Sequence, residues 1–327
     1  MEAAIITTYQ CIAHCQMCYV WKYPTKREDE IRPEILKKLP PLSFCNITGG
    51  EPFLRDDLGE IVQILKRKTK RIVISTNGYF TDRILDLTRK DKQIGIRISL
   101  EGLAKANDEL RGLQDGFDRG LRTLLELQRM GLKDVGFGIT VSDRNARDML
   151  ELYQMAKSLN LEFATAVVHN SYYFHKHDNE ISQKEEVIAC FRILVEELLR
   201  TKRVKNWYRG YFNYGLINYI RGNPRLLPCV AGEDMFFLDP WGEIRPCNGM
   251  DSDSLDNSMG NLNEASFEAI WKGPKAISLR EKVKNCPKNC WMIGTASPAM
   301  KTNILKPSLW VARNKLRVIL GKPICLD

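Results

Sequence analysis

The sequence predicts an α/β fold, in which a parallel sheet with helical crossovers is followed by a small cysteine-rich region. Up to residue 201, β-branched apolar segments alternate with segments of helical periodicity. Such alternation gives parallel strands with right-handed crossovers, and ligands are then expected at the carboxyl ends of the strands. After residue 224 the composition changes, and four cysteines follow before residue 291. This second part predicts a separate metal-binding region.

The first part contains six expected strand-helix units. The strands cover residues 3–10, 42–48, 71–75, 94–100, 134–141 and 162–168. The helices cover residues 32–39, 57–67, 81–89, 117–130, 146–159 and 182–201. Pro33 suits the first turn of its helix, and Gly131 ends the helix that precedes it. Cys45 and Cys190 fall on apolar faces and are expected to be buried, unreactive thiols.

The second part begins with a predicted hairpin. Residues 235–247 comprise an apolar strand, a Pro-Trp-Gly turn and a return strand that ends at Cys247. From residue 301 onward, six Lys or Arg and one acidic residue are interleaved with apolar side chains. This tail predicts an amphipathic helix that either lies on a membrane surface or docks on the protein. We therefore divide the chain into residues 1–224, 225–295 and 296–327.

Composition restricts the class of protein. At 327 residues and 44% apolar content the chain can bury a sizeable core. It shows no export signal and no apolar run long enough to cross a bilayer, so we expect a soluble or peripheral protein. Ten cysteines in such a chain favour metal ligation over disulfides, and reduced thiols favour a cytoplasmic location. The net charge of +9 favours an anionic partner or reflects a generally basic surface.

The first cysteine cluster directly follows the first strand. Cys11, Cys15 and Cys18 lie within eight residues, and three thiolates can bind three corners of a 4Fe-4S cluster. One iron is then left open, and an under-coordinated metal can bind and activate a small molecule. A zinc site with His14 or a distant cysteine as fourth ligand is the alternative, which the spacing alone does not exclude.

Several stretches together resemble a known family. The Cys-x3-Cys-x2-Cys spacing at the end of a strand, followed after the next strand by Gly-Gly-Glu-Pro at residues 49–52, resembles the signature of the radical S-adenosylmethionine (radical SAM) superfamily. The runs at residues 99–102, 110–112 and 116–118 resemble its SPASM branch. Met17 replaces a usual aromatic and Glu101 a usual Asp. The resemblance extends from about residue 5 to residue 291 and implies a partial (β/α)6 TIM-type barrel.

The resemblance also implies a cofactor and its contacts. In the family, S-adenosylmethionine chelates the open iron and is cleaved to a 5'-deoxyadenosyl radical, which abstracts hydrogen from the substrate. The residues implied to bind the cofactor are Gly49, Gly50, Glu51, Pro52, Ser99 and Arg111. The Glu51 side chain and the backbone carbonyls of the turn would accept hydrogen bonds from the methionyl ammonium. Ser99 would bind the ribose or carboxylate region, and Arg111 would pair with the carboxylate.

The later cysteines resemble the ligands of an auxiliary cluster. Cys229, Cys247, Cys286 and Cys290 suffice for one 4Fe-4S cluster that is fully ligated by protein, as in a twitch domain. A four-cysteine zinc ribbon is the alternative. No catalytic side chain is assigned from the sequence. His169 opens a segment rich in histidine and aromatic residues, 169–177, and is the candidate for contact with substrate, with a polar loop as the alternative.

These features predict a radical SAM oxidoreductase or modifying enzyme. The expected reaction is oxidation of a sugar-like or anionic small molecule, with the auxiliary cluster as electron acceptor. Modification of a ribosomal peptide is an alternative, and a zinc-stabilised nucleic-acid-binding module is an alternative from another class. The expected partners are a small-molecule or peptide substrate, an electron donor such as flavodoxin or ferredoxin, and, in one interpretation of the tail, a membrane surface. Under the enzyme interpretation no nucleic acid is expected.

Overall fold

The computed structural model describes residues 1–250 and 255–326. In these residues the strands form one sheet in the order β6-β5-β4-β3-β2-β1-β7-β8-β9. The strands are β1 (Glu2–Ile6), β2 (Phe44–Thr48), β3 (Ile72–Thr76), β4 (Gly95–Ser99), β5 (Val135–Val141), β6 (Glu162–Val167), β7 (Met235–Leu238), β8 (Glu243–Arg245) and β9 (Gly260–Asn261). The first six strands are parallel and adjacent in chain order, which confirms the predicted fold class.

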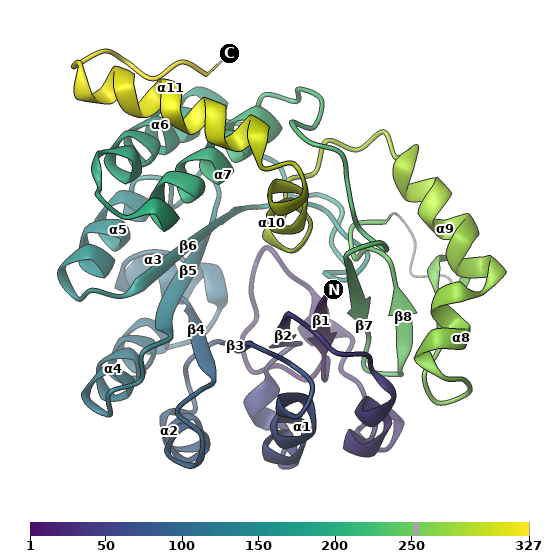
Figure 1. Ribbon diagram of the computed structural model, residues 1–327. Coiled ribbons are helices and arrows are strands. Elements are labelled where there is room, and N and C mark those ends of the chain that lie inside the picture. Colours follow the sequence, from purple (N-terminus) through teal and green to yellow (C-terminus); the bar gives the residue numbers. More distant parts are fainter. Residues whose placement is uncertain (251–254, 327) are drawn as a thin grey trace.

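Helices connect and cover these strands. The α-helices are α1 (Leu58–Lys66), α2 (Thr81–Lys90), α3 (Ala104–Arg111), α4 (Gly116–Arg129), α5 (Asp148–Ser158), α6 (Lys184–Arg200), α7 (Val204–Ile220), α8 (Phe267–Lys272), α9 (Pro274–Lys284), α10 (Ile293–Thr302) and α11 (Leu305–Ile319). The short 3-10 helices are η1 (Val20–Lys22), η2 (Arg27–Asp29), η3 (Pro33–Lys38), η4 (Pro52–Leu54) and η5 (Leu255–Asn257). Figure 1 shows α1, α2, α4 and α5 along the outer side of the curved sheet, as in a partial barrel.

A row of isoleucines fixes the register of the first four strands. Ile5 pairs with Ile47, Ile47 with Ile74, and Ile74 with Ile96 across neighbouring strands. All four side chains are fully buried. Because β-branched residues pack well on a pleated surface and each buried side chain contributes ~1.5–3 kcal/mol, this row opposes any slip of register.

The predicted hairpin extends the same sheet. Strand β7 pairs in parallel with β1, with Ala3 opposite Phe236, and β8 returns antiparallel to β7. The hairpin is therefore confirmed, and the sheet runs without interruption from the first part of the chain into the second. Because β8 runs antiparallel to β7, Cys247, two residues after β8, packs with Met235 and Phe237 toward the end of the sheet where β1 begins.

Several elements differ from the sequence-based expectation. The α-helix expected at residues 32–39 is instead the 3-10 helix η3 at Pro33–Lys38. Helix α3 had not been expected, and it places Arg111 at its last position. Helix α7 was also missed, because it is apolar around most of its circumference and so lacks a clear amphipathic period.

Helix α7 holds the cysteine-rich region against the barrel. The indole Nε1 of Trp291 donates to the Phe212 carbonyl oxygen at 2.9 Å. A Cβ atom on Gly215 would lie 2.1 Å from the same nitrogen, so glycine is needed for the indole to pack on the helix. The neighbouring Cys290 is thereby tied to the barrel. Within the described residues, no helix is both long enough and apolar enough to cross a membrane.

Candidate functional site

The Gly-Gly-Glu-Pro turn packs tightly on the segment that follows β1. Gly50 N donates to Thr8 O at 2.7 Å, and Glu51 N donates to Gln10 O at 2.8 Å. A Cβ atom would lie 2.2 Å from Gln10 O at Gly50 and 2.5 Å from Thr8 O at Gly49. Glycine is therefore required for the turn to approach the protein's own backbone, and this approach fixes the turn beside the start of the first cysteine cluster. The assignment of Gly49 and Gly50 to cofactor binding stays a prediction.

The Glu51 side chain binds the end of strand β3. It is fully buried, and it accepts hydrogen bonds from Thr76 Oγ1 at 2.7 Å, Asn77 N at 2.7 Å and Phe53 N at 3.1 Å. Burial raises the pKa of Glu51, while the hydrogen bonds oppose this effect. The buried Pro52 begins η4 directly afterwards. Among the described residues, Asn77 Nδ2 is a buried donor with no partner, and it lies at the carboxyl end of β3 where a ligand is expected.

The segment 169–177 folds over this turn. Tyr173 Oη donates to Gly49 O at 2.8 Å, which is one of the carbonyls expected to bind the cofactor's ammonium. The backbone of Tyr19, beside the first cysteine cluster, donates to Phe174 O at 2.7 Å. Sequence reasoning identified the segment as a polar loop or part of a pocket, but it did not find these contacts. The aromatic residues in the segment were the available signal, and only the fold shows what they touch.

The first three cysteines lie close enough to influence one another's charge. Burial, with a smaller contribution from the nearby Cys15, raises the pKa of Cys11 and of Cys18 to about 12. Burial also raises the pKa of Cys15, an effect that Arg111 opposes. Three neighbouring buried thiolates are unfavourable without a cation. Metal coordination removes that cost because it deprotonates thiols outright, so the donor set fits an iron–sulfur cluster.

Arg111 is held beside these thiols by a buried carboxylate. Its Nη1 atom lies 3.2 Å from Glu101 Oε1, and Glu101 Oε2 accepts from Thr140 N at 2.5 Å. Burial by itself would lower the pKa of Arg111, but the negative charges of Cys15 and Glu101 outweigh this effect and raise the pKa. Arg111 Nε is a buried donor without a partner among the described residues. Ser99 ends β4 nearby in the chain and is half-buried. A negatively charged ligand group beside the cysteines would satisfy the free N–H.

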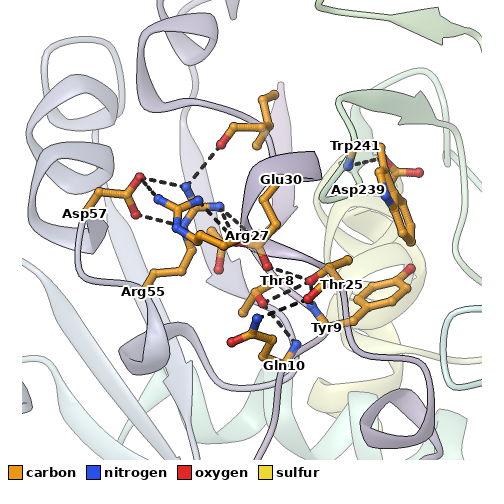
Figure 2. Close-up of polar contacts among 12 residues, drawn as sticks. Thr8, Tyr9, Gln10, Thr25, Arg27, Glu30, Arg55, Asp57, Asp239 and Trp241 are labelled. Atoms are coloured by element: carbon orange, nitrogen blue, oxygen red, sulfur yellow. Dashed lines mark hydrogen bonds and ion pairs between the residues drawn. The ribbon is translucent and has the colours of Figure 1, made fainter.

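A polar network fixes the backbone that leads into the cysteine cluster (Figure 2). The buried guanidinium of Arg55 donates to Asp57 Oδ1 at 2.9 Å and to Glu30 Oε2 at 3.2 Å. Thr25 Oγ1 donates to Glu30 Oε1 at 2.6 Å and accepts from Tyr9 N at 3.0 Å. Because Arg55 follows the Gly-Gly-Glu-Pro turn and Tyr9 precedes Cys11 in the chain, the network joins the two predicted halves of the cofactor site.

The four later cysteines also come together. Burial raises the pKa of Cys247 to about 12, and the nearby Cys290, Cys229 and Cys286 add to this effect. Cys247 follows the β7–β8 hairpin and packs with Met235 and Phe237, beside Cys229. Gly249 N donates to the Cys247 sulfur at 3.1 Å. Among the described residues, however, no three His, Cys, Asp or Glu side chains form a group that could hold a metal ion. Both cysteine sets therefore stay predictions as cluster ligands.

His169 lies at the carboxyl end of β6 as a neutral base. Its Nδ1 atom is 3.0 Å from the Val167 carbonyl oxygen, which can only accept a hydrogen bond. The neutral ring therefore carries its proton on Nδ1, and Nε2 is left as an acceptor. Nε2 is buried and has no partner among the described residues. Burial lowers the pKa of His169, which favours this neutral form.

Two cavities lie next to these groups. One of about 240 Å³ contacts Tyr9, Tyr172, His175, Asp239, Trp241, Glu243 and Arg245. The other, of about 670 Å³, lies between the segment after β6 and the cysteine-rich region, and its walls include His169, His177, Tyr219, Lys288, Asn289 and Cys290. The larger cavity has a size typical of small-molecule sites. In the described part of the chain, its lining contains a lysine and two histidines but no carboxylate side chain.

Family models match both parts of the chain. The model of the radical SAM superfamily matches residues 5–156. The model of an iron–sulfur cluster-binding domain, SPASM, matches residues 229–292. The second match covers all four later cysteines and assigns their region to iron–sulfur binding, which replaces the hypothesis of a zinc-stabilised nucleic-acid-binding module.

Curated relatives support the same assignment. The chain is 34% identical over 160 residues to Fe-coproporphyrin III synthase of Methanosarcina barkeri, a match that covers 45% of this chain and 39% of the relative. It is 25% identical over 294 residues to the subtilosin biosynthesis protein AlbA of Bacillus subtilis, which covers 84% of this chain and 60% of AlbA. It is 22% identical to pre-heme d1 synthase of Dinoroseobacter shibae, over 82% of this chain and 72% of the relative. The chain thus spans less than two thirds of the first two relatives.

Solved structures show the same fold at low sequence identity. Streptococcus suis SuiB bound to S-adenosylmethionine superposes with a TM-score of 0.66 at 16% identity, over 88% of this chain and 72% of SuiB. A structure of anSMEcpe with bound AdoMet and a peptide gives a TM-score of 0.62 at 15% identity, over 95% of this chain and 99% of anSMEcpe. These likenesses concern the fold alone, whereas the family-model matches show that the chain belongs to the radical SAM superfamily, through residues 5–156, and carries a SPASM domain at residues 229–292.

Proposed function

We propose that this protein is a radical SAM enzyme that oxidises an anionic small molecule bound in the 670 Å³ cavity. The observation that carries the proposal is the lining of that cavity, which joins the neutral base His169 to Cys290 of the second cysteine set. When bound, the cofactor and the first cluster supply a radical that removes hydrogen from an unactivated carbon. The protein has to hold the substrate, orient it and accept the proton that an oxidation releases.

The binding of the cofactor is assigned to two sets of residues. Cys11, Cys15 and Cys18 would hold the first 4Fe-4S cluster and leave one iron open, because no fourth protein ligand is assigned. Arg111 would pair with the carboxylate of S-adenosylmethionine through its free Nε. The backbone carbonyls of the turn at residues 49–52 and the Glu51 side chain would accept hydrogen bonds from the cofactor's ammonium group. Ser99 would bind its ribose or carboxylate region.

The substrate class follows from the charge of the cavity. Among the described residues, the lining of the cavity contains one basic side chain of the Lys or Arg type, Lys288, and no Asp or Glu. His169 and His177 also line it. A carboxylate- or phosphate-bearing molecule would be favoured there, and the net charge of +9 acts in the same direction. Pre-heme d1 synthase and Fe-coproporphyrin III synthase are named for tetrapyrrole products, a class rich in carboxylates, so these relatives support the anionic choice.

His169 is the proposed proton acceptor. Its Nε2 is an unprotonated nitrogen without a partner among the described residues, and burial, which lowers the pKa of His169, favours that form. Cys229, Cys247, Cys286 and Cys290 would hold the auxiliary 4Fe-4S cluster, whose place at the wall of the same cavity suits an electron acceptor. Flavodoxin or ferredoxin would supply the electron for the first cluster.

A peptide substrate is the second candidate function. AlbA, a protein of bacteriocin biosynthesis, matches 84% of this chain, and SuiB has been solved with its precursor peptide SuiA. The two candidates differ in what should stimulate cofactor cleavage. An anionic small molecule such as coproporphyrin III should do so in the first case, and an unstructured peptide in the second.

The deciding experiment is anaerobic reconstitution followed by iron and sulfide counting and a 5'-deoxyadenosine assay with dithionite. Cofactor cleavage should be stimulated by a polycarboxylate or a sugar phosphate and not by neutral sugars. Lys288→Met should raise the KM for that substrate, while Lys282→Met, on the exposed side of α9, should leave it unchanged. Equal stimulation by neutral and anionic molecules would reject the substrate class. Cleavage by a Cys11, Cys15, Cys18→Ala triple variant would reject the enzyme assignment.

A further inference from the structure

Helix α11 carries a stripe of exposed apolar side chains on its outward face. The exposed fraction is 77% for Leu305, 71% for Leu309, 57% for Leu316, 70% for Ile319 and 59% for Leu320. Their spacing places them on one side of an α-helix, along nearly its whole length. Figure 1 shows α11 at the outer edge of the molecule, across α6 and α7.

The opposite face already docks the helix on the protein. Trp310 is buried and stacks on Tyr214 with ring centroids 4.9 Å apart. Lys315 Nζ donates to Leu199 O at 3.0 Å and to Thr201 O at 3.1 Å. A surface helix with one docked face normally exposes a polar face to water. Here the outward face is apolar as well, so docking on the protein does not account for the stripe.

Basic residues surround the stripe. Residues 301–326 contain six Lys or Arg and no Asp or Glu. Lys306, Arg313 and Arg317 fall on one flank of the stripe by helical geometry. Arg313 forms no ion pair with any described residue, and neither does Lys322, just beyond the helix. The face therefore combines apolar area with unneutralised positive charge.

We propose that the outward stripe of α11 docks the enzyme on the surface of an anionic lipid bilayer. Exposed leucines beside lysine and arginine are the features by which a helix lies in the lipid interface, where apolar burial and attraction to anionic headgroups act together. A second copy of this chain fits worse, because a two-fold contact would bring these cations together without carboxylates to pair them. The contact is peripheral and independent of the reaction in the larger cavity.

Flotation of the reconstituted protein with vesicles tests the proposal. The protein should bind vesicles of equimolar phosphatidylglycerol and phosphatidylcholine and not vesicles of phosphatidylcholine alone. Leu305→Ser with Leu309→Ser should weaken binding by at least ~tenfold, and Arg313→Glu with Lys322→Glu should do so in a salt-dependent way. Because these side chains are exposed, each variant should keep the parent's unfolding transition.

Matched controls come from helix α9. Ile277 is 55% exposed, and Ile277→Ser should leave vesicle binding unchanged. Lys275→Glu with Lys282→Glu repeats the charge change away from the stripe and should also have little effect. The proposal is overturned if the protein ignores anionic vesicles, binds neutral ones equally well, or keeps binding in the leucine variant. A dimer that dissociates on Leu309→Ser would instead assign the stripe to a second copy.

Discussion

Variants of the buried pair Arg111–Glu101 can separate the contribution of Arg111 to protein stability from its proposed contribution to cofactor binding. In Arg111→Met the volume is nearly kept, but the Glu101 carboxylate loses its cationic partner at 3.2 Å in a site from which water is almost excluded. Removing one partner of such a pair costs about 3–5 kcal/mol of unfolding free energy. Glu101 would then take up a proton or recruit water, and its hydrogen bonds with Thr140 would remain.

The double variant Glu101→Gln, Arg111→Met should recover most of this loss. A neutral glutamine amide at position 101 can still accept from Thr140 N and leaves no buried charge, so the remaining cost should be about 1–2 kcal/mol. The cofactor, in contrast, still lacks its proposed cationic partner in the double variant. A hydrogen bond to a charged group is worth about 1.5–3 kcal/mol, so the Kd for S-adenosylmethionine should rise by at least ~tenfold in both variants.

Urea unfolding gives the first quantity, and equilibrium dialysis of S-adenosylmethionine with the anaerobically reconstituted protein gives the second. If the single variant is as stable as the parent, the pair does not have the energetic role that its burial indicates. If the recovered double variant binds S-adenosylmethionine with the parent's Kd, Arg111 does not contact the cofactor's carboxylate. The two results are independent, because one concerns the fold and the other concerns the ligand.

Three further predictions concern the rest of the molecule. Gly50→Ala places a Cβ atom 2.2 Å from a backbone oxygen and should cost at least about 1–3 kcal/mol in urea unfolding, whereas Gly59→Ala, with its nearest contact at 3.9 Å, should be neutral or stabilising. Burial alone would raise the pKa of Glu162, but Arg209 and Lys205 outweigh it and lower the pKa to about 2. A carboxyl group whose pKa is lower in the folded state stabilises the fold at pH values above its unfolded-state pKa. Glu162→Gln should therefore cost about 2 kcal/mol of unfolding free energy near neutral pH, allowing for partial exposure, and the difference should shrink as the pH falls from 4.5 toward 2. A difference that does not change with pH would contradict the pairing. Cys286→Ala with Cys290→Ala should still cleave S-adenosylmethionine slowly but form no product, and normal turnover would remove the auxiliary cluster from the reaction.

The order of strands and helices could be predicted from the sequence, because the spacing of apolar residues indicates which face of each element is buried. Strand β3 has β-branched residues in succession, and β2 ends in the Gly-Gly-Glu-Pro turn, so both strands were located to within a few residues. The hairpin was predictable from its turn residues. Helix α7 was not, since its apolar residues surround it on most sides. The type of helix at residues 33–38 could not be predicted either, because apolar residues have similar spacing in a short 3-10 helix and in one turn of an α-helix.

By itself the sequence indicated the family and the parallel order of the first six strands, because these depend on residue types at short spacings. The division of the cysteines into two sets of cluster ligands stays a prediction. Only the tertiary structure decided that β7 pairs with β1, that Tyr173 donates to Gly49 O, and that Glu101 holds Arg111. It alone showed that α11 is apolar on its outward side as well as on its docked side. The physical reason is that a pattern reports which residues avoid water or carry charge, whereas their partners are chosen by packing between segments that lie far apart in the chain.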